Sequence, residues 1–206
     1  MTPEQQKFYD IKNTTDYKKV GADVDYKIIV DHAKKEVVLQ FQESSSREDW
    51  KNNLDFLPWP LKLGDKTVWT TKGYATAYRS ANDIPRNELI TIWAAELNYK
   101  LCIRGWSFGS AMAKITARHM ETFGWTIDEL TTYGDVKCWL NPFYKAKNII
   151  RQREYTTPND GITWCVPFYN RDKKCQVGKF KLRALFKSEY YHTHYEDYDY
   201  SKWEEA

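Results

Sequence analysis

Histidine and glycine are scarce in this chain of 206 residues, which holds four of the first and nine of the second. With nine Gly and seven Pro, the chain is neither collagen-like nor of low complexity. Disorder is excluded as well, because nine Trp, fifteen Tyr and nine Phe need a packed interior. An enzyme that depends on histidine must therefore draw its base from a very short set of candidates.

Neither sign of charge dominates, since Lys and Arg number 31, Asp and Glu 28, and the formal net charge is +3. This balance argues against nucleic acid or an anionic membrane as a partner. The basic stretch Arg171–Lys187 contains no recognisable nucleic-acid motif. No apolar run approaches the ~18 residues of a membrane-spanning helix, and the first residues lack the apolar core of a signal peptide. We therefore expect a cytoplasmic protein without a transmembrane segment.

The cysteines match no zinc-ligand spacing, because no C-x-x-C and no nearby histidine pair accompanies Cys102, Cys138, Cys165 and Cys175. We expect free thiols in a reducing compartment and neither a metal nor an organic cofactor. The alternative, if the protein is exported, is a disulfide between Cys165 and Cys175 across a hairpin.

The order of strand-like and helical segments predicts an α/β fold with a mainly parallel sheet and an N-terminal antiparallel hairpin. The chain length fits a single domain over residues 1–206. Expected strands are Asp25–Val30, Glu36–Phe41, Thr67–Thr71, Lys100–Arg104, Glu129–Tyr133 and Asn148–Tyr155. Expected helices are Asn82–Asn98, with Asp83 as its cap and Pro85 in its first turn, and Ser110–Phe123.

Two C-terminal segments are expected to be peripheral. Thr163–Lys187 reads as a β-excursion or hairpin with scattered basic residues. Glu196–Ala206 is acidic and aromatic, which suggests a surface tail that pairs loosely with those basic residues.

The most informative local motif is the G-x-S-x-G of Gly105–Gly109, which follows a predicted strand and opens a predicted helix. That setting is typical of a nucleophile elbow, in which Ser107 stands at a strained turn. A Cβ on either flanking glycine would collide with the adjacent strand or helix. The motif also directs the next backbone N–H toward a developing oxyanion. An ordinary strand-to-helix turn that holds a serine remains the alternative.

A serine nucleophile needs a base, and in this architecture the order along the chain is Ser, then acid, then His. His32 falls in the early hairpin turn, and His119 lies ~18 Å down the helix that follows the serine. The base is therefore expected to be His192 or His194. Solvated histidines on a tyrosine-rich surface are the competing interpretation.

The acid should lie between the serine and those histidines, at the carboxyl end of a strand. Asp128 precedes its strand and so points to the wrong edge of the sheet, whereas Asp135 and Asp160 each follow one. Asp160 stands in Pro158–Gly161, a strong turn sequence, and a turn at the end of a strand suits a triad acid. Asp135 and Asp172 remain as alternatives. We expect Ser107 Oγ within ~3–4 Å of a histidine nitrogen, with the acid on the far side of that ring.

From about Asp25 to Tyr195 the chain resembles the class 3 (fungal-type) lipases, a branch of the α/β-hydrolases. The resemblance predicts the α/β-hydrolase fold, with helices on both faces of the sheet. It rests on motifs that follow one another in the family's order: Phe41–Trp50, Val68–Tyr74, Gly105–Ala113, Thr132–Gly134, Asn159–Asp160 and His192–Tyr195.

The resemblance implies specific roles. Ser107 is the nucleophile, Asp160 the acid, and His192 the base, because it stands three residues before Tyr195. The backbone amides of Ser44 and Phe108 form the oxyanion hole, and Asp49 and Trp50 are supporting residues. The family's lid falls between Trp50 and Gly73; here this region is short, and Trp59 and Leu61 either line an acyl pocket or belong to the core.

The chain also departs from the family pattern. Trp106 replaces a histidine, Ser110 replaces a glycine, and Gln42-Glu43 replaces Arg-Gly beside the oxyanion loop. A carboxylate at Glu43 that faces the pocket would oppose an oxyanion.

The implied function is serine hydrolysis of a small-molecule acyl ester through an acyl-enzyme, without a cofactor. A thioesterase or amidase with the same triad is an alternative. A non-catalytic binding or structural protein on this fold is another, suggested by Glu43 and Trp106.

Overall fold

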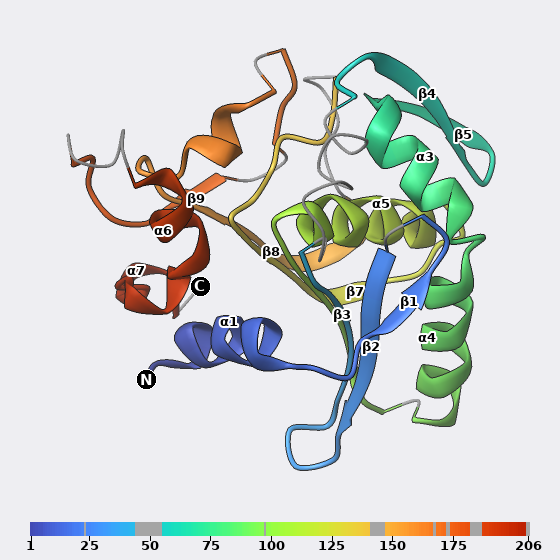
Figure 1. Ribbon diagram of the computed structural model, residues 1–206. Coiled ribbons are helices and arrows are strands. Elements are labelled where there is room, and N and C mark those ends of the chain that lie inside the picture. The colour runs from blue at the N-terminus through green and yellow to red at the C-terminus, as the bar shows by residue number, and fades with distance from the viewer. Residues whose placement is uncertain are drawn as a thin grey trace.

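The computed structural model describes residues 1–22, 24–43, 55–96, 98–140, 147–166, 168–171, 174–181 and 187–204. Its centre is a seven-stranded sheet in the order β1-β2-β3-β6-β7-β8-β9 (Figure 1). From β3 to β9 neighbouring strands run parallel, whereas β1, β2 and β3 pair antiparallel. The strands are β1 (Lys18–Val20), β2 (Val24–Asp31), β3 (Glu36–Phe41), β6 (Lys100–Trp106), β7 (Ile127–Tyr133), β8 (Ile149–Thr156) and β9 (Lys174–Gln176).

Helices cover both faces of this sheet, and the predicted fold class, α/β-hydrolase with an N-terminal antiparallel hairpin, is confirmed. One face carries α4 (Ile84–Ala95) and α5 (Phe108–Thr122), with α3 (Lys72–Ser80) packed on α5. The other carries α1 (Pro3–Asn13), which contacts β6 and the short helix η3 (Tyr195–Asp197). Figure 1 shows α1 beside the C-terminal helices α6 (Ser188–Thr193) and α7 (Ser201–Glu204).

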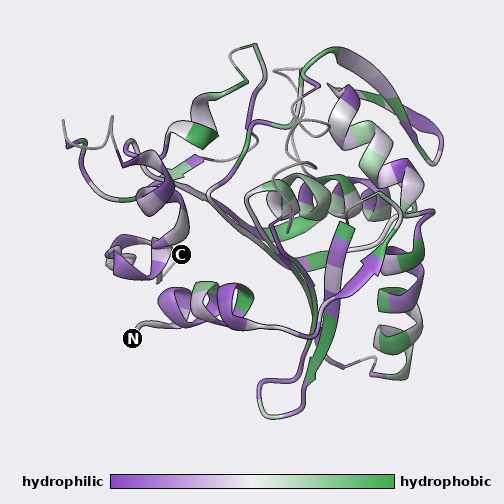
Figure 2. Ribbon diagram, viewed as in Figure 1, coloured by the Kyte–Doolittle hydropathy of each residue, from purple (hydrophilic) through white to green (hydrophobic). Residues whose placement is uncertain are grey.

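The main core lies between the sheet and the α4–α5 layer, and Figure 2 shows green hydrophobic residues along α4, α5 and the strands. Leu89 of α4, Ile103 of β6 and Ile115 of α5 have no exposed surface. Burial of such side chains stabilises a domain by roughly 1.5–3 kcal/mol each, so this layer holds α5 rigidly under the strands. The position of residue 107, between β6 and α5, is fixed by that packing.

The segment before α3 is more ordered than expected. Thr67–Thr71 is a strand as predicted, within β5 (Lys66–Thr71), but it pairs antiparallel with β4 (Pro58–Leu63), where the sequence indicated a loop. Two prolines hide β4 from sequence-based prediction. They are tolerated because the β4–β5 ribbon has only two strands, so each is an edge strand. Leu61 is buried in the main core, whereas Trp59 is exposed.

The predicted cap of the first long helix is wrong. Asp83 does stand at the N-cap of α4 and Pro85 lies in its first turn, but the Asp83 side chain makes no capping hydrogen bond. Its carboxylate pairs instead with Arg86 at 3.1 Å and with His119 at 3.3 Å. The carboxylate thus contacts Arg86 in the first turn of α4 and His119 of α5, and no backbone amide of α4.

The expected hairpin over residues 163–187 is absent from the part of that range that the structure describes. Gly161–Trp164 form a 3-10 turn, η1, and the short β9 adds to the sheet parallel to β8. Cys165 and Cys175 are both free thiols, as are Cys102 and Cys138. Within the described ranges, no helix is long and apolar enough to cross a membrane. Location in the cytoplasm stays a prediction.

The C-terminal segment is not the loose surface tail expected. Tyr195 and Tyr200 are fully buried, and with Phe8, Trp106, Tyr133 and Tyr155 they belong to a second core on the α1 face of the sheet. The Tyr155 and Tyr200 rings meet edge to face with centroids 4.7 Å apart. Burial of aromatic side chains this large is strongly favourable. The segment therefore packs against the α1 face of the sheet, although acidic residues lie between the aromatic ones.

Phe8→Ala should lower the free energy of unfolding by about 3–5 kcal/mol, because the buried ring contacts Trp106, Tyr133 and Tyr195. Urea denaturation measures the change. Phe168→Ala, at a ring 82% exposed, should change the stability by less than about 0.5 kcal/mol. Similar midpoints for the two variants would contradict a second core on the α1 face.

Candidate active site

Ser107 stands at the carboxyl end of β6, where the chain turns into α5. Its backbone is strained, with φ 55° and ψ −122°, and its amide donates to the Tyr133 carbonyl at 3.0 Å. The flanking glycines allow the turn to close: a Cβ on Gly105 would lie 2.3 Å from the Gly109 carbonyl oxygen, and one on Gly109 would lie 2.5 Å from the Gln42 carbonyl oxygen. No larger residue fits at either position.

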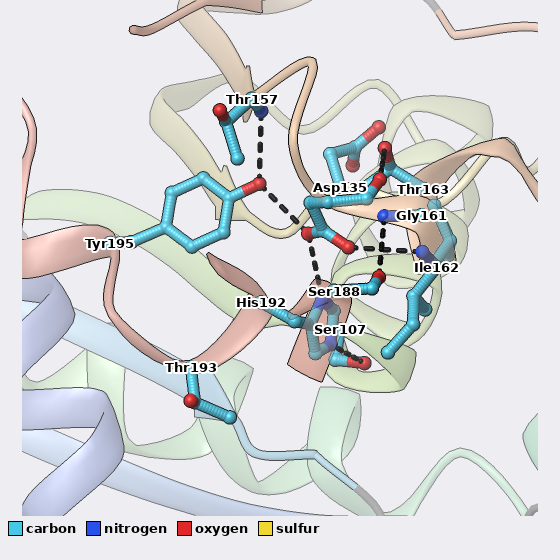
Figure 3. A network of polar contacts seen from close by, with 12 residues as sticks. Ser107, Asp135, Thr157, Gly161, Ile162, Thr163, Ser188, His192, Thr193 and Tyr195 are labelled. Carbon is cyan, nitrogen blue, oxygen red and sulfur yellow. Dashed lines mark hydrogen bonds and ion pairs between the residues drawn. The ribbon is translucent and has the colours of Figure 1, made fainter. Parts of the chain in front are cut away.

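His192 comes from α6, far away in the sequence, and its ring lies against the turn. Its Nε2 is 2.7 Å from Ser107 Oγ, and its Nδ1 is 2.7 Å from Asp160 Oδ2. In Figure 3 a dashed line joins the His192 ring to Ser107. Ser107 and His192 are 1% exposed and Asp160 is fully buried, so water screens these contacts little. The serine, imidazole and carboxylate thus form one continuous chain of hydrogen bonds.

Asp160 is held from several sides. Its Oδ1 accepts a hydrogen bond from the Ile162 amide at 3.1 Å, at the N-cap of η1. Its Oδ2 accepts, besides the histidine, the hydroxyl of Tyr195 at 3.0 Å (Figure 3). The Tyr195 oxygen in turn accepts from the Thr157 amide at 3.1 Å. Burial and the charge of Asp160 raise the pKa of Tyr195 well above its ordinary value, so the tyrosine remains a donor.

Two further residues orient the histidine. Trp106 Nε1 donates to the His192 carbonyl oxygen at 3.1 Å, which fixes the backbone of α6 against β6. Gly134, with φ 53°, passes under the ring, and a Cβ there would lie 2.8 Å from His192 Cε1. Sequence reasoning gave neither residue this role, although Trp106 departs from the family pattern and Gly134 belongs to one of its motifs.

The pKa of His192 reflects opposing influences. Burial lowers it, but the hydrogen bond and charge of Asp160 and the charge of Glu43 outweigh burial, so the pKa is raised above the ordinary 6.5. Glu43 Oε1 lies 3.8 Å from Nε2. Burial raises the pKa of Glu43 too, although the charge of His192 acts against this. The imidazole thus stands between two carboxylates.

The other histidines do not reach this site. His194 stacks on Tyr190 with centroids 4.0 Å apart, and its Nδ1 lies 2.8 Å from the Tyr190 carbonyl oxygen. His32 contacts the hydroxyl of Tyr99 at 2.9 Å. His119 lies farther along α5, and its Nε2 accepts the Gly64 amide at 3.1 Å. Of the two histidines that the sequence left open, His192 is the one beside Ser107.

The alternative acid has a different environment. Asp135 is fully buried and binds Lys114 Nζ, at 2.9 Å to Oδ1, and Arg171 Nε, at 3.1 Å to Oδ2. Arg171 also donates to the Thr163 carbonyl oxygen at 2.6 Å, which ties Asp135 to η1. Its carboxylate therefore joins structural elements near the site, and Asp160 occupies the place beside the imidazole.

Of the two expected oxyanion donors, one, Phe108, lies within the described residues. The amide of Phe108 is the first of α5, and the first N–H groups of a helix have no partner within the helix. Ser44, Asp49 and Trp50 lie outside the described residues, as does Asp172. Within the described ranges no group of three or more His, Cys, Asp or Glu side chains could hold a metal ion.

Gly134→Ala should push the imidazole away from Asp160, because the new methyl group would overlap His192 Cε1. The pKa of His192, followed by NMR titration, should then fall from its raised value. Gly124→Ala is the matched control, since Gly124 also has a positive φ, 79°, but no atom lies within 4 Å of its added Cβ. Both variants should lose about 1–2 kcal/mol of stability through backbone strain. An unchanged pKa in the Gly134 variant would show that the glycine does not position the ring.

The chain is similar in structure to solved structures of fungal lipases. The chain superposes on a fungal lipase–inhibitor complex with a TM-score of 0.67 and 19% identity, covering 79% of this chain and 65% of that one. For a Rhizomucor miehei lipase–propeptide complex the TM-score is 0.63 and the identity 18%, covering 77% and 54%. For a triacylglycerol lipase whose catalytic centre is described as a serine protease triad, the values are 0.66 and 18%, with 82% and 66% covered.

These similarities concern the fold, and the chain spans less than two thirds of the length of those lipases. No curated protein matches the sequence. The model of the lipase (class 3) family, however, matches residues 38–148, more than half of the chain. The matched region runs from β3 through the Ser107 turn to the end of β7 and beyond. The chain therefore belongs to the lipase (class 3) family.

Proposed function

We propose that the protein is a serine hydrolase that cleaves a small-molecule carboxylic ester, with Ser107 as nucleophile, His192 as base and Asp160 as the orienting acid. The observation that carries the proposal is the pair of 2.7 Å contacts on the two nitrogens of His192. A neutral imidazole in this position donates from Nδ1 to Asp160 and accepts the Ser107 proton at Nε2. Membership of the class 3 lipase family supports ester hydrolysis.

The reaction proceeds in two halves. Ser107 Oγ attacks the ester carbonyl as its proton passes to Nε2, and the imidazolium formed is stabilised by Asp160. Nε2–H then protonates the departing alkoxide, which leaves as the alcohol and an acyl-Ser107. Water, deprotonated by the same nitrogen, attacks the acyl carbonyl; the bond to Ser107 Oγ then breaks as Nε2–H returns the proton to Oγ, and the carboxylic acid is released. No cofactor takes part in these steps.

The oxyanion is proposed to bind the backbone amide of Phe108 and that of Ser44. Phe108 begins α5, so its N–H adds to the favourable field at the amino end of a fifteen-residue helix. The role of Ser44 rests on the family motif alone.

A non-catalytic hydrolase-fold protein is the alternative that a specific observation favours. Glu43 lies 3.8 Å from Nε2, and a carboxylate there opposes an oxyanion. The same carboxylate also stabilises the imidazolium, which favours transfer of the Ser107 proton to Nε2. The intact hydrogen bonds around His192 lead us to prefer catalysis.

Ser107→Ala should abolish hydrolysis of a short-chain p-nitrophenyl ester, lowering kcat by at least about 10³-fold, because the nucleophile is gone. A fluorophosphonate probe should label the wild type and not this variant. Ser201→Ala, at an exposed position on α7, should keep both activities. Equal rates for wild type and Ser107→Ala would overturn the catalytic proposal.

The kcat/KM of the wild type should fall as the pH drops through the pKa of His192, because only the neutral imidazole can accept the serine proton. Since this pKa is raised above 6.5, the acid limb of the pH profile should lie above that value. Asp160→Asn removes the charge that holds the pKa up, so its acid limb should move to lower pH and its kcat should fall. An acid limb below pH 6.5 in the wild type would contradict the assignment of His192 as base.

A further inference from the structure

Glu43 is a polar residue beside the triad that forms no bond and exchanges no proton in the proposed reaction. It follows the carboxyl end of β3 by two residues, and its carboxylate faces the nitrogen that exchanges protons with the serine. Ser107 and His192 are 1% exposed, but the Glu43 side chain keeps 19% of its surface exposed. Glu43 therefore lies on the outer side of the triad, where an incoming ester can reach it.

Within the described ranges, no Lys or Arg side chain forms an ion pair with the Glu43 carboxylate. Among the residues described by the structure, His192 is the one group within ion-pair distance of this carboxylate. The other charges that act on Glu43 are the carboxylates of Asp160 and Glu189, both of the same sign. Lys114 and Arg171, which lie near the site, form ion pairs with Asp135 and are not among the charges that act on Glu43. When His192 is neutral, the described groups on the outer side of the site therefore carry negative charge.

The distance between Glu43 and His192 limits how far a bound ester can lie from the Glu43 carboxylate. Nε2 must come within hydrogen-bond reach, ~3 Å, of the alcohol oxygen that it protonates. With Glu43 Oε1 3.8 Å from Nε2, that oxygen lies at most about 7 Å from the carboxylate. A positive group two carbons from the ester oxygen can approach closer still, and in a half-buried site opposite charges at such distances attract appreciably.

We propose that Glu43 determines specificity, favouring esters whose alcohol part carries a positive charge, such as a quaternary ammonium, over neutral and anionic esters. This inference rests on the proposed ester hydrolysis. A cation near Glu43 offsets the repulsion between this carboxylate and the oxyanion, so the gain is largest in the transition state. An anionic alcohol meets repulsion from Glu43 throughout the reaction.

Three esters of one acid test the proposal: the 2-(trimethylammonio)ethyl ester, its uncharged carbon isostere the 3,3-dimethylbutyl ester, and the 2-carboxyethyl ester. In the wild type kcat/KM should decrease in that order. In Glu43→Gln the ratio of cationic to neutral ester should fall about fivefold, as expected for one partly exposed charge pair. The ratio cancels effects on catalysis that both esters share. Fluorophosphonate labelling of Ser107 shows that the variant keeps its site.

Glu189→Gln is the matched control, because Glu189 belongs to α6 and acts on Glu43 but is exposed to water. It should leave the ratio of cationic to neutral ester close to that of the wild type. A ratio unchanged in Glu43→Gln, an equal loss in Glu189→Gln, or a wild type that prefers the anionic ester would overturn the proposal. If the wild type hydrolyses none of the three esters, the proposed function itself has failed, and this inference falls with it.

Discussion

The hydrogen bond between His192 Nδ1 and Asp160 is the interaction on which the rest of the site depends. It fixes which ring nitrogen carries the proton in the neutral state, and it therefore leaves Nε2 free to accept from Ser107. Burial disfavours a charged imidazole, and the carboxylate of Asp160 compensates for this. Without the carboxylate, the same buried ring would be a weaker base and could turn to another partner.

That hydrogen bond is itself supported by the aromatic core on the α1 face. Tyr195 donates to Asp160, and Tyr200 donates to the Tyr195 carbonyl oxygen at 2.8 Å. Phe8 packs on Tyr195 from α1, and Trp106 joins the same cluster while it binds the His192 carbonyl oxygen. The position of the acid and the orientation of the base are thus set by packing on the face of the sheet opposite α5. Hydrophobic packing there holds the polar atoms of the site in position.

Much of this arrangement could be predicted because its signals are local or follow the order of the chain. The Gly105–Gly109 turn can be recognised from its motif, because close contacts with neighbouring backbone require a glycine at both positions. The order serine, acid, histidine then left few candidates. The features that escaped prediction depend on contacts between distant segments. The buried state of Tyr200, the β4–β5 ribbon and the roles of Trp106 and Gly134 are all decided by what folds against them.

The separation of the contacting segments along the chain has a consequence for how the site forms. His192 lies 85 residues beyond Ser107, and the Gln5 side chain binds the Tyr198 carbonyl 193 residues further on. Contacts across such distances close large loops and form late in folding. The chain loses conformational entropy when the loop closes, before the contacts that stabilise the closed loop have formed. The strained serine turn can be complete when β6, α5 and β7 have assembled, but the imidazole arrives only when α6 docks. A chain emerging from the ribosome therefore carries an inert serine until its C-terminal segment has been made.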